Sequence, residues 1–155
     1  MVGPNTALID NPKLTVRRVK GKSPMRIFID KGLKIPSASY LLDGSVQTLV
    51  FTARQKQAKK NVEYVIIDFR KDVLEQILQE LGNRYIQSLI VEGGAALLNL
   101  FLKQNLWDEA RVFTNKKMLS EIAEKKVNGV EAPRMKMEPA HSMKMGSDDL
   151  KIYYN

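Results

Sequence analysis

The sequence predicts an α/β fold, with a mostly parallel central sheet flanked by helices and a C-terminal antiparallel pair of strands. Short apolar runs that end in a polar residue recur along the chain, and such runs are typical of strands. Segments with apolar residues at helical spacing lie among them. Strands that alternate with helices form parallel sheets with helices on their faces.

Three strands are expected first, over residues 25–30, 47–52 and 63–68. The first, MRIFID, alternates and ends in a polar residue, and the runs QTLVFT and EYVIID are similar. A helix is then expected to end at Gly82, since glycine commonly follows the last turn of a helix. Its apolar residues share helical spacing; they are Val73, Leu74, Ile77, Leu78 and Leu81.

The rest of the chain predicts a fourth strand over 87–93 that runs directly into a helix over 94–104, and a fifth strand over 108–115. Segments 134–145 and 150–155 are expected to pair antiparallel around a turn at 146–149. The polar stretch 119–133 is expected to be a surface loop, or a short helix plus loop. The chain contains no repeats, so we expect one domain over residues 1–155.

Composition restricts the class of function. The 155 residues include no cysteine and one histidine, His141, which excludes disulfides and multi-histidine zinc sites, so no metal is expected. The N-terminus lacks the pattern of a signal peptide, and no run approaches the roughly 20 apolar residues of a membrane span. These features predict a cytoplasmic protein that does not bind membranes.

The formal net charge of +8 leaves three interpretations open. Lysines and arginines are spread along the chain, without the interleaved aromatic residues of a single-strand binder, so nucleic-acid binding is not expected. A solvated basic surface and the binding of a phosphorylated small molecule remain. The latter needs only two or three well-placed cations.

The junction of the fourth strand and its helix, IVEGGAALL, has two interpretations. Gly93 and Gly94 could let a phosphate approach the helix N-terminus, with Glu92 pointing into the crevice beyond the strand. Alternatively, the two glycines form a tight turn and Glu92 is solvated. Local sequence does not decide between them.

The segment TALIDNPKLTVR is also ambiguous. Asp10-Asn11-Pro12 is a turn signal, and Leu14 and Val16 then alternate with polar residues, as in an edge strand. The functional alternative is a polar pair, Asp10 and Arg17, that lines a pocket, with the Arg17 guanidinium binding a phosphate.

Thr52 and Arg54, after the second strand, suit a nucleotide ribose or its 2′-phosphate, but a solvated loop fits them as well. Their position at the carboxyl end of a strand is where open α/β sheets bind ligands. Local sequence therefore does not decide whether Thr52 and Arg54 bind a nucleotide or belong to a solvated loop.

In this order, NTALIDNPKLTVR, PMRIFID, QTLVFT and SLIVEGGAALLNLFLKQNLWDEARVF resemble the reductase domain of the bifunctional riboflavin biosynthesis deaminase/reductase, the RibD type. The resemblance extends from Met1 to about Asn115. The elements D-[DN]-P-x-L-[TN]-x-R and V-E-G-G-A are specific as a pair, while either alone would be weak.

The resemblance implies a dihydrofolate-reductase-like fold and riboflavin biosynthesis as the pathway. It implies NADPH-dependent reduction of 5-amino-6-(5-phosphoribosylamino)uracil to 5-amino-6-(5-phosphoribitylamino)uracil, with hydride delivered to ribosyl C1′. A homodimer and a deaminase domain in the full-length protein are also implied.

On the substrate side, the resemblance implies roles for Asp10, Leu14, Arg17 and Glu92. Arg17 would bind the ribosyl 5′-phosphate, and Asp10 would orient the sugar or assist proton transfer. Glu92 falls on a glutamate near the substrate. Asp10 and Glu92 are therefore the two catalytic candidates.

On the cofactor side, Gly93, Gly94 and Ala95 match residues whose backbone N–H groups face the NADPH phosphate. Thr6 and Thr52 match positions expected near the cofactor. The resemblance implies no metal.

The chain departs from the family pattern at both ends. Upstream strands and the N-terminal zinc deaminase domain are absent, and MVG reads as the end of a strand, which predicts an N-terminally truncated chain. After Asn115 the usual Pro-containing, Gly-rich segment is replaced by a different sequence. Two alternatives therefore stay open: another dihydrofolate-reductase-like NADPH reductase, or an inactive scaffold fragment.

Overall fold

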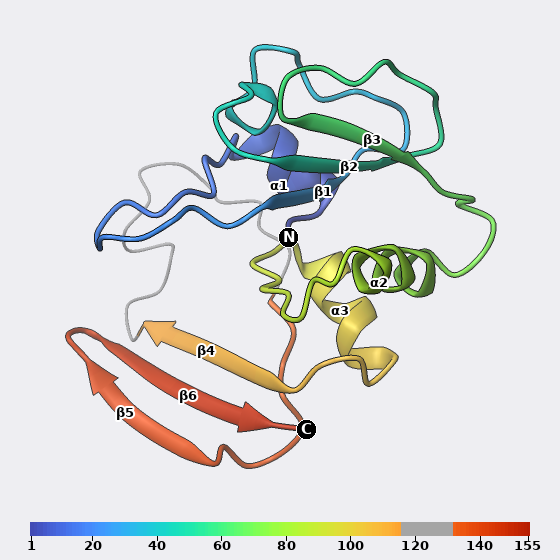
Figure 1. Ribbon diagram of the computed structural model, residues 1–155. Coiled ribbons are helices and arrows are strands. Elements are labelled where there is room, and N and C mark those ends of the chain that lie inside the picture. Colours follow the sequence, from blue (N-terminus) through green and yellow to red (C-terminus); the bar gives the residue numbers. More distant parts are fainter. Residues whose placement is uncertain (116–131) are drawn as a thin grey trace. The chain divides into compact units, whose positions relative to one another are not determined.

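The computed structural model describes residues 1–115 and 132–155, which form two compact units, Met1–Leu98 and Asn99–Asn155. Figure 1 traces the elements along the chain. None of the helices within the described ranges is long and apolar enough to cross a membrane.

Unit 1 is built on three parallel strands in the order β1 (Arg26–Ile29), β2 (Thr48–Thr52) and β3 (Val62–Ile66). Phe28 lies opposite Val50, and Val50 lies opposite Tyr64. The prediction of three parallel strands is confirmed, with ends that differ by one or two residues.

The fourth predicted strand, Gln87–Gly93, is wrong as a regular strand. The segment is extended, but its only ladder contact in the described part of the chain is a parallel bridge between Gly93 and Val2. Val2 is bridged on its other side to Phe28. The three residues Met1–Gly3 thus lie between this segment and β1, and so short a partner supports no longer ladder.

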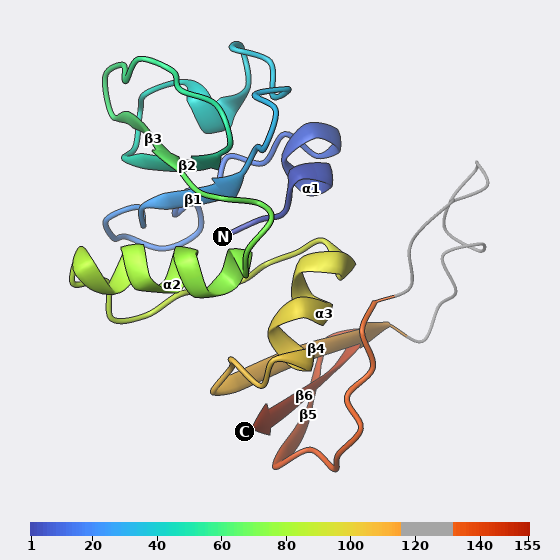
Figure 2. The same cartoon turned by 90° about the vertical axis from the view of Figure 1, so that its right-hand side faces the viewer.

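The two faces of the sheet are covered differently, as Figure 2 shows. One face packs against α1 (Pro4–Ile9) and the short helix η1 (Tyr40–Leu42), within a cluster of buried side chains. The cluster consists of Val2, Ala7, Phe28, Ile35, Leu41, Leu42, Val50 and Val62. Burying each larger side chain contributes roughly 1.5–3 kcal/mol.

Helix α2 (Val73–Asn83) lies on the other face. The ion pair between Arg84, which follows the helix, and Glu63 of β3 joins it to the sheet there. Leu74, Ile77 and Leu81 form its buried stripe. The Asp72 carboxylate caps the first turn by accepting a 2.9 Å hydrogen bond from the N–H of Glu75.

Helix α2 was predicted to end at Gly82, but it ends one residue later, at Asn83. Tyr85, with φ of 57°, supplies the left-handed conformation that follows the helix, so glycine is not needed for it.

Helix α1 was not foreseen. Pro4 occupies its first turn, where a missing N–H costs nothing, and Ala7 is its one buried residue. The edge strand that sequence alternation favours around Leu14 and Val16 is also absent, because Leu14 adopts φ of 45°, outside the extended region.

Helix α3 (Ala95–Lys103) matches the prediction over 94–104 and leads into unit 2. There β4 (Glu109–Asn115), β6 (Asp148–Tyr154) and β5 (His141–Met145) form an antiparallel sheet in that order. The predicted closing pair is confirmed, with Gly146 at φ of 66° in the turn. Its first strand begins at His141 rather than at residue 134. The predicted loop over 119–133 lies outside the described residues, except for its last two.

Candidate functional site

Two helices start within unit 1 at the same edge of its parallel array. Val2 and Gly93 are bridged in parallel, so the segments they belong to run in the same direction. Helix α1 follows the first segment at Pro4, and α3 follows the second at Ala95. Ligands of open α/β sheets bind at this carboxyl edge.

A side-chain hydrogen bond joins the two helix starts. The backbone N–H of Gly94 donates to Oγ1 of Thr6 over 3.0 Å. The N–H of Gly3 donates to the carbonyl of Gly93 over 2.8 Å. Thr6 and Gly94, both predicted at the cofactor, are thus in direct contact, and α1 is fixed to the start of α3.

The same contact accounts for one of the two glycines. A Cβ on Gly94 would meet Thr6 Oγ1 at 3.2 Å, which is tight, whereas a Cβ on Gly93 would meet it at 3.8 Å. Neither glycine has a positive φ. The pair therefore serves close approach rather than a left-handed turn.

The first turn of α3 retains donors for an anion. A helix leaves its first N–H groups without partners inside the helix. Gly94 gives its N–H to Thr6, while those of Ala95 and Ala96 have no partner among residues 1–115 and 132–155. Glu92 is exposed beside this turn, and its N–H donates to the carbonyl of Met1.

Asp10 lies one helical turn from this junction. It follows α1 directly, and its N–H donates to the carbonyl of Thr6 over 3.0 Å. Residues four apart share one side of a helix, so Asp10 lies on the side of α1 that carries the Thr6 contact. Its carboxylate is exposed and has no hydrogen-bond partner within the described ranges.

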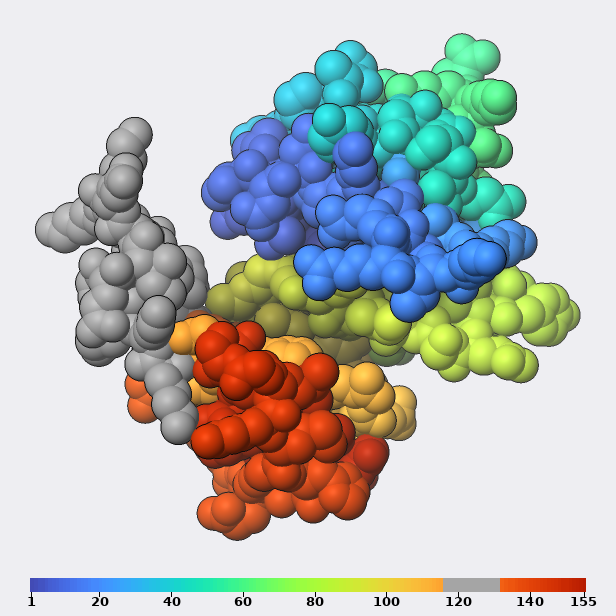
Figure 3. Space-filling model, turned by 90° about the vertical axis from the view of Figure 1, so that its left-hand side faces the viewer, coloured from blue at the N-terminus to red at the C-terminus, as the bar shows by residue number. Residues whose placement is uncertain are grey.

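The segment after Asp10 runs out and back as a long arm before β1 (Figure 1), and its blue atoms lie on the surface in Figure 3. The N–H of Val16 donates to Oγ of Ser23 and joins its two limbs. Leu14 turns inward and packs against the buried cluster, whereas Arg17 is exposed and, in the part described, unpaired.

Sequence reasoning missed Arg26. This side chain is only 1% exposed, and its guanidinium donates to the carbonyls of Lys13 and Tyr40 and to Asp43 and Ser45. A buried charge is tolerated only when it is paired in this way. An arginine among the apolar residues of MRIFID is the signal that could have found it.

The Arg26 network also perturbs an acid. Burial raises the pKa of Asp43, but hydrogen bonds from Ser45 and Arg26, together with the charge of Arg26, outweigh it and lower the pKa to about 2. Asp43 is therefore ionised whenever the network is intact.

Thr52 is fully buried at the end of β2. Its hydroxyl donates to the carbonyl of Lys31 over 3.3 Å and accepts from the N–H of Arg54 over 3.2 Å. The Thr52 hydroxyl, which was predicted to lie near the cofactor, is thus engaged in hydrogen bonds within the protein. The exposed groups at this point are the basic side chains of Lys31 and Arg54.

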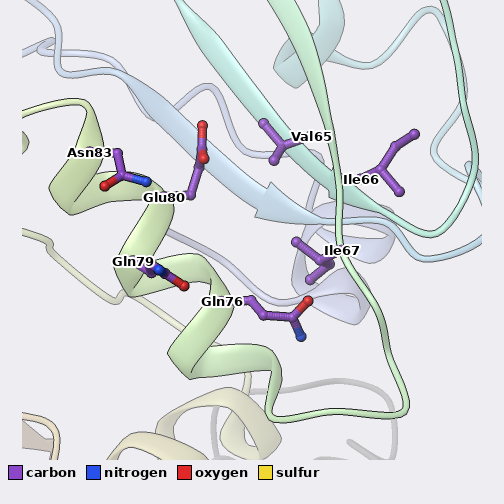
Figure 4. Close-up of a pocket in the computed structure, with 7 residues that line it drawn as sticks. All are labelled: Val65, Ile66, Ile67, Gln76, Gln79, Glu80 and Asn83. Carbon is purple, nitrogen blue, oxygen red and sulfur yellow. The ribbon is translucent and has the colours of Figure 1, made fainter.

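The pocket in Figure 4 lies elsewhere, between β3 and α2. It has a volume of about 300 Å³ and is lined by Val65, Ile66, Ile67, Gln76, Gln79, Glu80 and Asn83. None of the predicted site residues lines it. In the described part of the chain, no three His, Cys, Asp or Glu side chains group in a way that could hold a metal ion.

Comparison with known proteins identifies the family. The family model described as RibD C-terminal domain matches residues 1–150. The chain therefore belongs to the RibD C-terminal domain family, and the resemblance found in the sequence is confirmed.

Two curated relatives illustrate the match. The chain is 31% identical over 129 residues to the 2,5-diamino-6-ribosylamino-4(3H)-pyrimidinone 5′-phosphate reductase of Archaeoglobus fulgidus, covering 73% of this chain and 59% of the relative. It is 37% identical over 128 residues to riboflavin biosynthesis protein RibD of Aquifex aeolicus, covering 78% and 35%. The chain thus matches between about a third and three fifths of these relatives' length.

Solved structures agree on the fold. A deaminase/5-amino-6-(5-phosphoribosylamino)uracil reductase from Thermotoga maritima has a TM-score of 0.77 at 25% identity, covering 97% of this chain and 43% of that one. Acinetobacter baumannii RibD has a TM-score of 0.78 at 21% identity, covering 99% and 45%. The dihydrofolate-reductase-like α/β fold predicted from the sequence is confirmed.

Proposed function

We propose that the chain is the reductase part of a riboflavin biosynthesis enzyme and reduces 5-amino-6-(5-phosphoribosylamino)uracil to 5-amino-6-(5-phosphoribitylamino)uracil with NADPH. The observation that carries the proposal is the geometry of α1. Thr6, in its first turns, is bonded to Gly94, and Asp10 lies one turn further on. This geometry supports the proposal that the two halves of the family pattern, 82 positions apart from Asp10 to Glu92, form one site.

The cofactor side fits a dinucleotide. At the start of α3 the N–H groups of Ala95 and Ala96 are available for a phosphate, and a Cβ on Gly93 would find only Thr6 Oγ1 within 4 Å, so there is room for close approach. Gly93, Gly94 and Ala95, with Thr6 behind them, would hold NADPH, and Thr52, buried at the end of β2, would support the cofactor side through its hydrogen bonds to Lys31 and Arg54. When bound, NADPH would supply the hydride that reduces ribosyl C1′.

The charged groups of the proposed substrate side, Asp10, Arg17 and Glu92, are exposed. Arg17 would bind the ribosyl 5′-phosphate, because a guanidinium matches phosphate geometry with two parallel hydrogen bonds. Asp10 would orient the open sugar or move a proton, and Glu92 would do so from the other helix start. Leu14 anchors the segment in the buried cluster and so contributes to the substrate side by its packing.

A second substrate is favoured by the relatives' names. Archaeoglobus fulgidus, Methanothermobacter thermautotrophicus and Aquifex aeolicus each have a relative named as a reductase of 2,5-diamino-6-ribosylamino-4(3H)-pyrimidinone 5′-phosphate. That substrate carries the same ribosyl phosphate, so Arg17 and Asp10 would serve both reactions. The groups that would discriminate are those facing the pyrimidine ring.

The proposal extends to assembly and location. We propose one reductase domain over residues 1–155 that forms a homodimer and acts in the cytoplasm, with a deaminase domain in the full-length protein. The relative from Thermotoga maritima is described as both deaminase and reductase, which supports the last point. No metal is proposed for this chain.

The test is to titrate the chain with NADPH by calorimetry and to follow NADPH oxidation with each of the two pyrimidine substrates. Binding in the micromolar range and turnover of one substrate are expected, and NADH serves as the control for selectivity. Binding without turnover of either substrate would favour a different reductase of this fold. The absence of NADPH binding would favour the inactive scaffold.

A further inference from the structure

Two residues outside the predicted site hold the segment that carries Asp10 and Arg17. The first is Arg26, whose buried Nε donates to the carbonyl of Lys13 over 2.8 Å. Its Nη1 donates to the carbonyl of Tyr40 over 2.7 Å. One guanidinium thus fixes the main chain of the segment to the short helix η1.

The second is Asn11. Its Oδ1 accepts hydrogen bonds from Oγ of Ser39 over 2.6 Å and from the N–H of Tyr40 over 2.9 Å. Asn11 has φ of 41°, a left-handed conformation that asparagine tolerates better than most residues. Near it, the Lys13 ammonium lies 4.5 Å from the centre of the Tyr40 ring. Several contacts therefore converge on Tyr40.

Two charged residues flank the part of the segment that Asn11 and Arg26 hold. Asp10 comes immediately before Asn11, and Arg17 follows three residues after Leu14; both are exposed and, over the described ranges, without partners. Holding a carboxylate and a guanidinium without partners in place contributes nothing to the stability of the fold. It does contribute to binding and catalysis, because small displacements of a reacting group lower the rate by large factors.

We propose that Asn11 and Arg26 are positioning residues for the phosphorylated substrate, acting through the segment that presents Asp10 and Arg17. This inference rests on the proposed function. Neither residue would touch the substrate, since Arg26 is buried and the Asn11 oxygen is engaged with Ser39 and Tyr40.

Asn11 allows a well-matched pair of variants. Asn11→Gly keeps the freedom to adopt positive φ but removes the acceptor, whereas Asn11→Asp keeps both. Glu63→Gln is the control, because it weakens an ion pair with Arg84 that involves neither the segment nor Arg26. Arg26 itself is a poorer target, since removing its guanidinium would leave the groups that it pairs with unsatisfied and destabilise the whole unit.

The 155-residue chain and these variants are compared in steady-state kinetics and NADPH titration. We expect Asn11→Gly to raise the KM for the ribosyl phosphate substrate about tenfold, with NADPH affinity unchanged, because a loosened segment affects only that substrate. Asn11→Asp and Glu63→Gln should stay within about threefold of wild type. In the double variant with Arg17→Ala, Asn11→Gly should add little further loss, because both act through the same side chain.

Amide hydrogen exchange of residues 13–17 gives a second readout, with faster exchange expected in Asn11→Gly alone. An unchanged KM in Asn11→Gly, with wild-type turnover intact, overturns the positioning role and leaves the proposed function standing. A KM that rises equally in Glu63→Gln also overturns it, since the effect would then be general destabilisation. If the wild type turns over neither substrate, the proposed function fails and the inference fails with it.

Discussion

The backbone N–H of Gly94 donates a 3.0 Å hydrogen bond to Oγ1 of Thr6, 88 positions earlier in the chain. This bond joins the starts of α3 and α1, and both of its residues belong to the proposed cofactor side. Thr6 thus belongs to the candidate site through its hydrogen bond with Gly94, independently of any contact with a ligand.

Thr6→Val should destabilise the fold. Valine has a similar shape but no acceptor, so the partly buried N–H of Gly94 would lose its partner, at a cost of about 1–3 kcal/mol. Urea unfolding measures this loss. Thr6→Ser keeps the hydroxyl and is the control; equal stability of the two variants would show that the hydrogen bond contributes nothing.

Gly94→Ala should weaken both stability and NADPH binding more than Gly93→Ala. The new Cβ on residue 94 would lie 3.2 Å from Thr6 Oγ1, compared with 3.8 Å for residue 93. Thermal unfolding and calorimetry with NADPH compare the two variants. Combining Gly94→Ala with Thr6→Ala removes the crowding atom, so the pair should recover part of the loss; a purely additive effect would contradict the steric explanation.

Arg17→Ala should raise the KM for the phosphorylated substrate far more than it weakens NADPH binding. The guanidinium is exposed and free of protein partners in the part of the chain that is described, so its loss should leave stability within about 0.5 kcal/mol. Arg18→Ala, at the neighbouring exposed cation, is the matched control. Equal losses for substrate and NADPH would remove Arg17 from the substrate side.

Tyr64→Phe should leave stability unchanged or raise it by up to about 1 kcal/mol. Among the residues described, the buried Tyr64 hydroxyl has no hydrogen-bond partner, and an unsatisfied buried group costs free energy. Denaturant unfolding of this variant measures the effect. A clear destabilisation would mean that the hydroxyl has a partner, such as a buried water.

Stability should fall in acid partly through Asp43. Its pKa is lowered from the ordinary value of 3.8 to about 2, so its contribution is complete above about pH 4 and is lost as the pH falls towards 2. Asp43→Asn should therefore be less stable than wild type at neutral pH and approach it near pH 2, as measured by urea unfolding across this range.

Asp68 provides the control for salt. Its pKa is also lowered to about 2, by hydrogen bonds from Arg70, whose side chain is 89% exposed. Because Arg26 is buried and Arg70 is not, about 1 M salt should reduce the effect of Asp68→Asn and leave that of Asp43→Asn largely intact. The opposite result would contradict the role assigned to the buried network.

The sequence predicts the regular elements with strong local patterns. Strands β1 to β3 and helix α2 follow from apolar spacing, because burial imposes that spacing. Helix α1 could not be predicted in this way, since six residues with a single buried position carry no periodic signal. The segment before Gly93 has the composition of a strand, but a strand also needs a partner of similar length.

The residues of the candidate site also differ in whether a local sequence pattern reveals them. Asp10, Arg17 and the two glycines could be proposed from the sequence because they belong to compact motifs. Arg26 and Asn11 could not, because their partners lie between 13 and 29 positions away in irregular loops, where no local pattern records the pairing. The role of the Thr52 hydroxyl depends likewise on a contact with Lys31, 21 positions earlier.

The shortness of α1 has a thermodynamic consequence. Six residues do not form a stable helix alone, because nucleation costs more than so few hydrogen bonds return. This helix persists because one end is tied to Gly94 and the other runs into the segment held by Asn11. It should therefore open and close as one cooperative unit, with amides at both ends exchanging at a common rate, so that ordering one end by a ligand lowers the entropic cost of ordering the other.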